Sequence, residues 1–381
     1  MKVYLDNAAS SPLSPEVFEY MKPYFLDFQG NPSSTHAHGR QLRNAIEEAR
    51  RAIASCLKVS PSEIIFTSGG TEADNTAIFG AVDAYKIQHI VSARTEHHAV
   101  THSVEYLEAK GKVKVTWLNV DSNGHIDTDE LNDVLSRSPQ TLVSLMHGNN
   151  EIGTIHDIAA IGEICRKYGA LFHSDTVQTM GNVDLNFSEI PVDFAAASAH
   201  KFYGPKGTGF MFVRKGIKIP PLIHGGGQER NLRAGTENPA FIAGMACALT
   251  HCAQTLEKKR THIIGLKNHM KTRLMEEIPG VRFNGEQDPG RSLPSVLNTT
   301  FPCGEGDAML LFHLDLAGIS ASGGSACNSG ALMGSHVLRE IGADTETLMN
   351  SVRFSFGIQN TREEIDFAVE TVKKQIPQVA K

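Results

Sequence analysis

The chain has 381 residues, of which 41% are hydrophobic, so it can bury a large core and more than one domain is expected. Its 36 basic and 42 acidic residues give a formal net charge of −6, and no long basic run is present, which argues against nucleic acid as the main partner. No apolar run approaches the roughly 18 residues of a membrane span. The start, "MKVYLDNAAS", lacks the pattern of a signal peptide, so a cytoplasmic protein without a membrane segment is expected.

The cysteines do not predict a metal site or a disulfide framework. None forms a C-x-x-C pair, and reduced thiols are the default interpretation of their spacing. The six cysteines are Cys56, Cys165, Cys247, Cys252, Cys303 and Cys327.

Up to residue 214 the chain alternates between helical and strand patterns. A helix is predicted over 40–57, where apolar residues recur with helical spacing. Strands are expected at 63–68, 89–93, 114–120, 141–146, 170–175, 194–199 and 209–214, and further helices at 71–85, 101–109 and 158–169. Strands separated by helices favour parallel pairing, so the predicted fold class is α/β, with a mostly parallel sheet covered by helices.

The pattern changes near Cys252. A long charged helix is predicted over 253–278, and the last helix begins with a capping box of Thr361 and Glu364. Between them we expect strands at 281–285, 295–301 and 351–358 and a helix over 306–316. We therefore predict a large domain over 14–255 and a smaller α+β domain. The first residues could pack against either domain, and we assign 1–13 together with 256–381 to the smaller one.

Ligands of open α/β sheets bind beyond the carboxyl ends of the strands. One such segment is "TSGGTEADN", where Gly69 and Gly70 let the backbone approach a ligand and Thr71 opens a helix. The N–H groups at a helix N-terminus favour an anion, usually phosphate. The alternative interpretation is a plain glycine turn with a threonine cap.

Two more strand ends carry ionisable residues. Asp175 directly follows an apolar strand, where a carboxylate caps a helix or pairs with a buried cation, and Gln178 lies in the next turn. Lys201 follows Ser198 and His200 among small residues. An amine at such a site can have a lowered pKa and form a Schiff base. Most lysines are solvated surface residues, however, and the nearby Lys206, among glycines, is the alternative amine.

Histidines and an amide follow other strands. His97 and His98 come just past one predicted strand and Asn150 just past another, although a lone histidine is more often structural than catalytic. A phosphate cradle, an aldehyde-trapping amine, a carboxylate for a ring cation and a stacking imidazole together fit pyridoxal 5′-phosphate. The glycine motifs of dinucleotide-binding folds and phosphate loops are absent from the sequence.

Cys327 lies in the glycine- and serine-rich stretch "ASGGSACNSG". Free cysteines usually behave as small buried hydrophobes. A thiol in a glycine-rich loop can instead be placed to react, because the thiolate is the nucleophile. The stretch alone does not decide between the two interpretations.

Taken together, the motifs resemble the aminotransferase class V family of pyridoxal-phosphate enzymes, and within it the cysteine desulfurases of the nitrogen-fixation and iron–sulfur-assembly type. Any one motif is weak, but their joint order along nearly the whole chain is specific. The motifs are "YLDNAAS", "GNPSSTHAHGR", "TSGGTEADN", "TEHHAV", "NNEIGT", "HSDTVQ", "SAHKFYGPKG", "GGGQERNLRAGTEN", "SGGSACNSG" and "VRFSFG". The family often carries alanine where this chain has Gly70.

The resemblance implies a fold-type I enzyme in which Lys201 holds the cofactor as a Schiff base. Asp175 would pair with the pyridinium nitrogen, and Gln178 and Asn150 would bind near the ring hydroxyl. His97 would stack on the ring and shuttle protons. The phosphate would be held by four residues of the same chain, Gly70, Thr71, Ser198 and His200.

The resemblance also implies a homodimer, in which Thr236 reaches the phosphate of the neighbouring subunit. Arg353, with Asn150, would bind the carboxylate of L-cysteine, a bidentate task that suits a guanidinium group.

Cys327 would accept the sulfur as a persulfide, L-alanine would leave, and the sulfur would pass to an acceptor such as an iron–sulfur scaffold protein. No resident metal is expected, although Cys327 could share a cluster with such a scaffold. A selenocysteine lyase or another class V enzyme is the alternative, and a non-catalytic sulfur carrier is a third hypothesis.

Overall fold

The computed structural model describes residues 1–138, 140–303, 309–323 and 334–376. Within these residues the largest sheet has seven strands in the order β2-β8-β7-β6-β5-β3-β4. The strands are β2 (Ile64–Thr67), β3 (His89–Ala93), β4 (Lys114–Leu118), β5 (Thr141–Ser144), β6 (Leu171–Asp175), β7 (Phe194–Ser198) and β8 (Gly209–Val213). The pairs from β7 through β6, β5 and β3 to β4 are parallel, which confirms the predicted α/β class.

One strand departs from the predicted parallel pairing. β8 is antiparallel to both of its neighbours, β2 and β7. The chain between β7 and β8 holds the short 3-10 helix η2 (Ala199–Lys201) and no helix of crossover length. A parallel connection needs about a dozen residues or more, so the chain reverses direction here.

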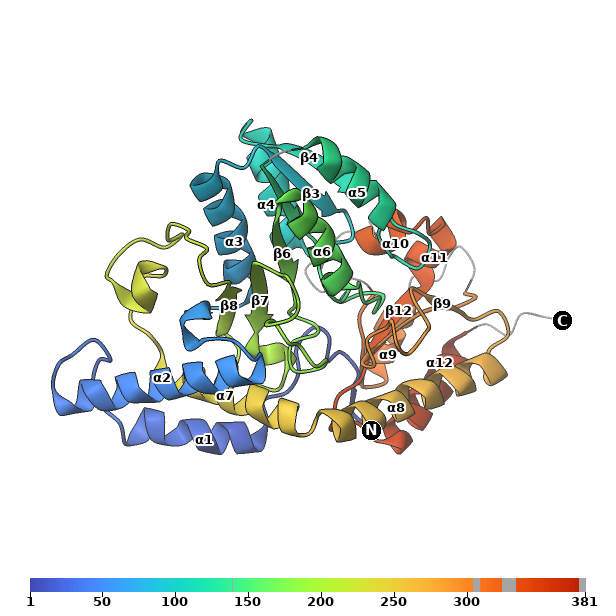
Figure 1. Cartoon of the computed structure of the whole chain (residues 1–381). Coiled ribbons are helices and arrows are strands. Elements are labelled where there is room, and N and C mark those ends of the chain that lie inside the picture. The colour runs from blue at the N-terminus through green and yellow to red at the C-terminus, as the bar shows by residue number, and fades with distance from the viewer. Residues whose placement is uncertain (139, 304–308, 324–333, 377–381) are drawn as a thin grey trace.

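Helices cover both faces of this sheet (Figure 1). Alternate residues of β2 point to opposite faces: Phe66 belongs to the core cluster that includes residues of α1, α2, α5, α6 and α7, and Ile65 to the cluster that includes residues of α3 and α4. Burial on both faces explains why the strands are continuous apolar runs. These helices are α1 (Pro15–Leu26), α2 (Ala37–Cys56), α3 (Gly70–Tyr85), α4 (His98–Ala109), α5 (Thr128–Arg137), α6 (Ile158–Tyr168) and α7 (Pro239–Gln254).

A second core surrounds a three-stranded antiparallel sheet in the order β12-β10-β9. Its strands are β9 (Arg282–Asn284), β10 (Val296–Thr300) and β12 (Ser351–Ser355). The helices of this core are α8 (Leu256–Glu277), α9 (Leu310–Leu316) and α12 (Arg362–Gln375), whereas α10 (His336–Glu340) and α11 (Thr345–Asn350) pack in a separate cluster with Ile152. The predicted capping box of Thr361 and Glu364 is confirmed at the start of α12.

Several helix boundaries differ from the prediction. The helix expected over 253–278 is two helices, because Thr255 has non-helical dihedral angles (φ −110°, ψ 11°) between α7 and α8. α4 begins at His98 rather than at residue 101, since His97 caps it. The pattern analysis did not predict α1, α5, α7, α10 or α11. No described helix is long and apolar enough to cross a membrane.

The N-terminal segment connects the two sheets. β1 (Val3–Tyr4) pairs in parallel with β11 (Ile319–Ser320) beside the smaller sheet. Asn7 Nδ2 donates to the main-chain oxygen of Ser355 in β12 (2.8 Å). Ser11 Oγ donates to the main-chain oxygen of His200, just past β7 (2.8 Å). Residues 6–10 therefore lie between the end of β7 and strand β12.

Candidate active site

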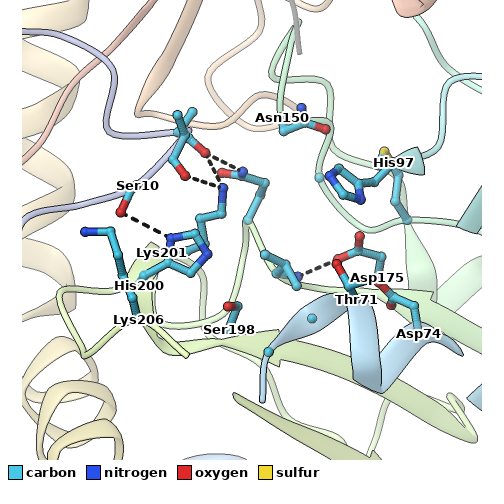
Figure 2. Close-up of a pocket in the computed structure, with 18 of the residues that line it drawn as sticks. Ser10, Thr71, Asp74, His97, Asn150, Asp175, Ser198, His200, Lys201 and Lys206 are labelled. Atoms are coloured by element: carbon cyan, nitrogen blue, oxygen red, sulfur yellow. Dashed lines mark hydrogen bonds between the residues drawn. The ribbon is translucent and has the colours of Figure 1, made fainter. Parts of the chain in front are cut away.

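A cavity of about 530 Å³ lies at the carboxyl ends of β6 and β7, beside the N-terminus of α3. Figure 2 shows Lys201 and His200 on one side of it and His97 and Asp175 on the other. The structure brings together here most of the residues predicted from the sequence. They are Gly70, Thr71, His97, Asn150, Asp175, Gln178, Ser198, His200, Lys201 and Arg353.

The N-terminus of α3 forms one wall of the cavity. Gly69 has a φ of +157°, a conformation that favours glycine, and a Cβ atom added to it would lie 3.5 Å from Ser198 Oγ. A Cβ atom at Gly70 would lie 2.6 Å from Val177 Cγ2, so an alanine here would require Val177 to shift. The N–H groups of the first turn of a helix have no intrahelical partner. This wall therefore offers main-chain donors to an anion.

His97 is held in one orientation by the helix that it caps. Its Nδ1 accepts the N–H of Ala99 (3.1 Å), so Nε2 carries the proton of the neutral ring. Burial lowers the pKa of His97, and the nearby Asp175 carboxylate opposes this shift. The ring thus reaches the cavity as a neutral imidazole with a fixed tautomer.

Asp175 ends β6 and is 7% exposed. Its Oδ1 accepts the N–H of Val177 (2.9 Å). Burial raises the pKa of Asp175, while His97, that N–H group and Lys201 lower it. A buried carboxylate at a cavity wall is stabilised by a cation. Asp175 is therefore suited to pair with a positively charged ring nitrogen.

Two further buried carboxylates, which the sequence analysis missed, lie near Asp175. Burial raises the pKa of Asp74 and of Glu96 well above the usual range, and the charge of Asp175 adds to both shifts. Asp74 Oδ1 is 3.3 Å from Nε2 of the buried His173. Neighbouring buried carboxylates disfavour one another's ionised forms, and of the three pKa values only that of Asp175 is lowered by Lys201 and His97.

The amine of Lys201 contacts the N-terminal segment. Its Nζ donates to the main-chain oxygens of Ala8 (2.6 Å) and Ala9 (2.9 Å), and Gln178 Nε2 also donates to Ala8 (3.0 Å). The sequence analysis quoted "YLDNAAS" without assigning these residues a role. Lys206 also lines the cavity, but its side chain is exposed, as its glycine-rich surroundings suggested.

His200 lies next to Lys201 in η2. Its Nδ1 is 3.2 Å from Ser10 Oγ. Burial, helped by the charges of Lys201 and Lys206, lowers the pKa of His200 to about 4. His200 is therefore neutral near pH 7.

Arg353 reaches the cavity from β12 and is 1% exposed. Its Nη2 forms an ion pair with Asp6 Oδ1 (2.7 Å), and its Nη1 donates to the main-chain oxygen of Asn150 (3.0 Å). A guanidinium has five N–H donors, so these contacts leave others for a ligand. The partner Asp6 also belongs to the "YLDNAAS" motif and was missed.

Two predicted residues are not part of this cavity. Thr236 is exposed and does not line it. Cys327, the predicted sulfur acceptor, lies outside the described residues. The neighbouring described residues are Gly323 before it and Gly334 after it.

Comparison with known proteins identifies the class of protein. Residues 3–367 match the family described as Aminotransferase class-V, and the chain belongs to this family, which uses pyridoxal 5′-phosphate. It is 44% identical over 377 residues to "Cysteine desulfurase IscS" of Dictyoglomus turgidum, covering 98% of this chain and 94% of that protein. It is 42% identical to "Cysteine desulfurase IscS" of Clostridium botulinum strain Hall, covering 99% and 95%. Among solved structures, a "NIFS-LIKE PROTEIN" is similar, with 35% identity, a TM-score of 0.91 and coverage of 98% and 99%.

The described residues fit the cofactor of the family. Gly70 and Thr71, at the start of α3, line the cavity, and the main-chain donors of this first helical turn suit a phosphate. Asp175 offers a buried carboxylate to a ring nitrogen, and the amine of Lys201 lines the same cavity.

Proposed function

We propose that the protein is a cysteine desulfurase, which converts L-cysteine to L-alanine and passes the sulfur to Cys327 as a persulfide. The observation that carries this proposal is the cavity containing Lys201, Asp175 and Arg353. It lies in a chain that aligns over 98% of its length with a curated cysteine desulfurase. The similarity to cysteine desulfurases supports L-cysteine as the substrate, and the residues that line the cavity support pyridoxal phosphate as the cofactor.

Each wall of the cavity would hold one part of pyridoxal phosphate. Gly70 and Thr71, at the start of α3, would bind the phosphate together with Ser198 and His200. Lys201 would bind the aldehyde carbon. Asp175 would neutralise the ring nitrogen, and the ring of His97 would stack on the cofactor. Asn150 and Gln178 would bind near the ring hydroxyl.

When bound, pyridoxal phosphate withdraws electrons from the amino acid attached to it. Arg353 would bind the carboxylate of the substrate through donors that Asp6 and Asn150 do not use. His97 would move protons through Nε2, since its Nδ1 accepts the N–H of Ala99. Lys201, released from the aldehyde carbon, would be a second proton carrier in the same cavity.

Cys327 would act as the nucleophile in its thiolate form. Its sulfur bonds to the sulfur of the substrate as the carbon–sulfur bond of the substrate breaks. The electron pair of that bond remains on carbon, which takes up a proton and leaves as part of L-alanine. The persulfide on Cys327 then donates its outer sulfur to an acceptor, for which we propose an iron–sulfur scaffold protein.

We further propose a homodimer. The exposed Thr236 would then reach the phosphate bound in the neighbouring subunit. α1 exposes large apolar side chains that a second copy would cover, with Phe18 51%, Tyr20 51%, Phe25 55% and Leu26 68% exposed.

We keep the proposed division into a large domain of 14–255 and a small domain of 1–13 and 256–381. A persulfide cycle needs a free thiol, which suits a reducing compartment such as the cytoplasm.

The proposal is tested by supplying the loaded protein with L-cysteine and measuring L-alanine, sulfide and transamination of a keto acid. A cysteine desulfurase forms L-alanine and, with a reductant, sulfide. Transamination without sulfide would contradict the proposal and favour another class V activity. Cys327→Ser should keep the absorbance of the bound cofactor and lose sulfide release. Unchanged sulfide release in that variant would refute the role of Cys327.

A further inference from the structure

A strained turn lies in the 224–236 segment, which contacts β2 at the edge of the large sheet. Three consecutive residues without a glycine among them, Glu229, Arg230 and Asn231, have φ angles of 42°, 57° and 66°. Side chains disfavour this left-handed region, and a run of such residues persists only when its surroundings hold it. The contacts of Glu229 identify what holds this turn.

Glu229 is 5% exposed and forms a bidentate ion pair with Arg50 of α2. Both hydrogen bonds, from Nη1 to Oε2 and from Nη2 to Oε1, measure 2.8 Å. Arg50 Nη1 also donates to the main-chain oxygen of Ile64 (2.7 Å), and its guanidinium lies 4.4 Å from the ring centroid of Phe66. The pair is therefore packed against strand β2.

The same ion pair also supplies a hydrogen-bond acceptor to a main-chain N–H group at the edge of the sheet. β2 is the last strand of the large sheet on this side. The N–H of Phe66 donates to Glu229 Oε2 (2.8 Å), so a side chain takes the place of a further strand. Arg50 and Glu229 thus clamp the 224–236 segment to β2, the strand that leads into the turn at Ser68.

A second ion pair continues from this segment to the cavity. Arg233 Nε lies 2.9 Å from Glu72 Oε1, in the first turn of α3. Glu72 Oε2 in turn accepts the N–H of Ser68 (2.9 Å). Both Ser68 and Glu72 line the cavity, next to the glycines of the cradle. The 224–236 segment therefore carries two ion pairs four residues apart, Arg50–Glu229 at β2 and Arg233–Glu72 at the wall of the cavity, and the main chain of the strained turn joins them.

We propose that Arg50 and Glu229 are positioning residues, which act through Arg233 and Glu72 to hold the Ser68–Thr71 turn in the shape that receives the cofactor phosphate. This inference rests on the proposed function, because the phosphate belongs to the proposed cofactor. It assigns a role to two buried charged residues that contact β2 and do not line the cavity.

The test compares the binding of pyridoxal 5′-phosphate and of pyridoxal, which lacks the phosphate, to the cofactor-free protein. The dissociation constants are measured by absorbance for the wild type, Glu229→Gln, Arg233→Gln and a control, Glu163→Gln. Glu163 pairs with Arg166 on an exposed surface of α6, with the two side chains 59% and 63% exposed. We expect Glu229→Gln and Arg233→Gln to weaken pyridoxal phosphate about tenfold, the loss expected when charge-assisted contacts no longer hold the turn.

The affinity for pyridoxal separates the possible outcomes. Since Lys201 and Asp175 are unchanged, pyridoxal should bind the variants and the control as it binds the wild type. An equal loss of both compounds, or no loss of either, would overturn the inference. A wild type that binds neither compound would instead refute the proposed function itself.

Arg50→Lys keeps the test valid where Glu229→Gln folds poorly, and a double variant tests whether the two ion pairs act on the same turn. Arg50→Lys keeps the charge but loses the bidentate geometry, so it should show an intermediate, phosphate-specific loss. The double variant Glu229→Gln with Arg233→Gln should weaken pyridoxal phosphate by less than the product of the two single effects, because both act on the same turn. Fully multiplicative effects would show that the two residues act independently, contrary to the proposal.

Discussion

The carboxyl edge of the large sheet lines the cavity directly, whereas the 224–236 segment contacts one of its walls from outside, through Arg233 and Glu72. Asp175, Ser198 and Lys201 lie at or just past the ends of β6 and β7, so the strand that each one follows sets its position. The 224–236 segment contains three left-handed residues and is held by Arg50, 179 residues from Glu229 in the sequence. The strands themselves therefore position Asp175, Ser198 and Lys201. In our proposal, by contrast, the Ser68–Thr71 turn is held by a buried ion pair that lies outside the cavity.

The largest effect is expected at the strand ends. Lys201→Ala removes the amine that would bind the aldehyde, so the visible absorbance of the bound cofactor should be lost entirely. Lys206→Ala is the control, because this exposed lysine lines the same cavity. Absorbance spectra after incubation with pyridoxal phosphate decide the point. Retained absorbance in Lys201→Ala, or its loss in Lys206→Ala, would show that the amines were assigned wrongly.

The next largest effect tests the ion pair behind the 224–236 segment. Glu229→Ala removes the buried bidentate partner of Arg50 and leaves it only the ion pair of Nε with the partly exposed Glu47 (3.0 Å), which should lower the free energy of unfolding by about 3 kcal/mol. The exposed Glu163→Ala should change it by less than about 1 kcal/mol. Denaturant unfolding measures both variants. Equal effects would mean that Glu229 contributes no more than a surface charge.

Acid should lower the stability of the fold through two buried histidines, one inside the central strand β6 and one just past β5. Burial lowers the pKa of His147 and of His173 to about 3 each, from an ordinary value of 6.5. The unfolded chain therefore binds protons first as the pH falls. Their contribution to stability is complete above pH 6.5 and declines between pH 6.5 and about 3, by roughly 1.4 kcal/mol per pH unit for each histidine. Denaturant unfolding at pH 7, 6 and 5 measures this slope. His147→Gln should flatten it, and an unchanged slope would contradict the assignment.

The smallest effect concerns the glycine of the cradle. In Gly70→Ala the new methyl group meets Val177 Cγ2 at 2.6 Å, so the free energy of unfolding should fall by about 1–3 kcal/mol. Val177→Ala in the same chain removes this overlap and should restore part of the loss. The comparison of the single and double variants by thermal unfolding tests the contact. No recovery in the double variant would place the strain elsewhere.

The strand-end residues were predictable because each one directly follows an apolar run that the sequence displays. Lys201, Asp175 and His97 are of this kind, and the α/β class follows from the same runs. The contacts of Ala8 with Lys201 and of Asp6 with Arg353 were not predictable from patterns, since they join distant parts of the chain. The antiparallel direction of β8 was missed because pattern analysis does not show which way a short connection turns. Cys327 lies outside the described residues, so its predicted role stays a prediction.

One measurement tests the proposed activity most directly. The protein loaded with pyridoxal phosphate is incubated with L-cysteine, and peptides containing each cysteine are examined by mass spectrometry. We predict that L-alanine forms and that the Cys327 peptide gains the mass of one sulfur atom, while the other five cysteines remain unchanged. A persulfide on another cysteine, or no persulfide despite turnover of cysteine, would contradict sulfur transfer to Cys327.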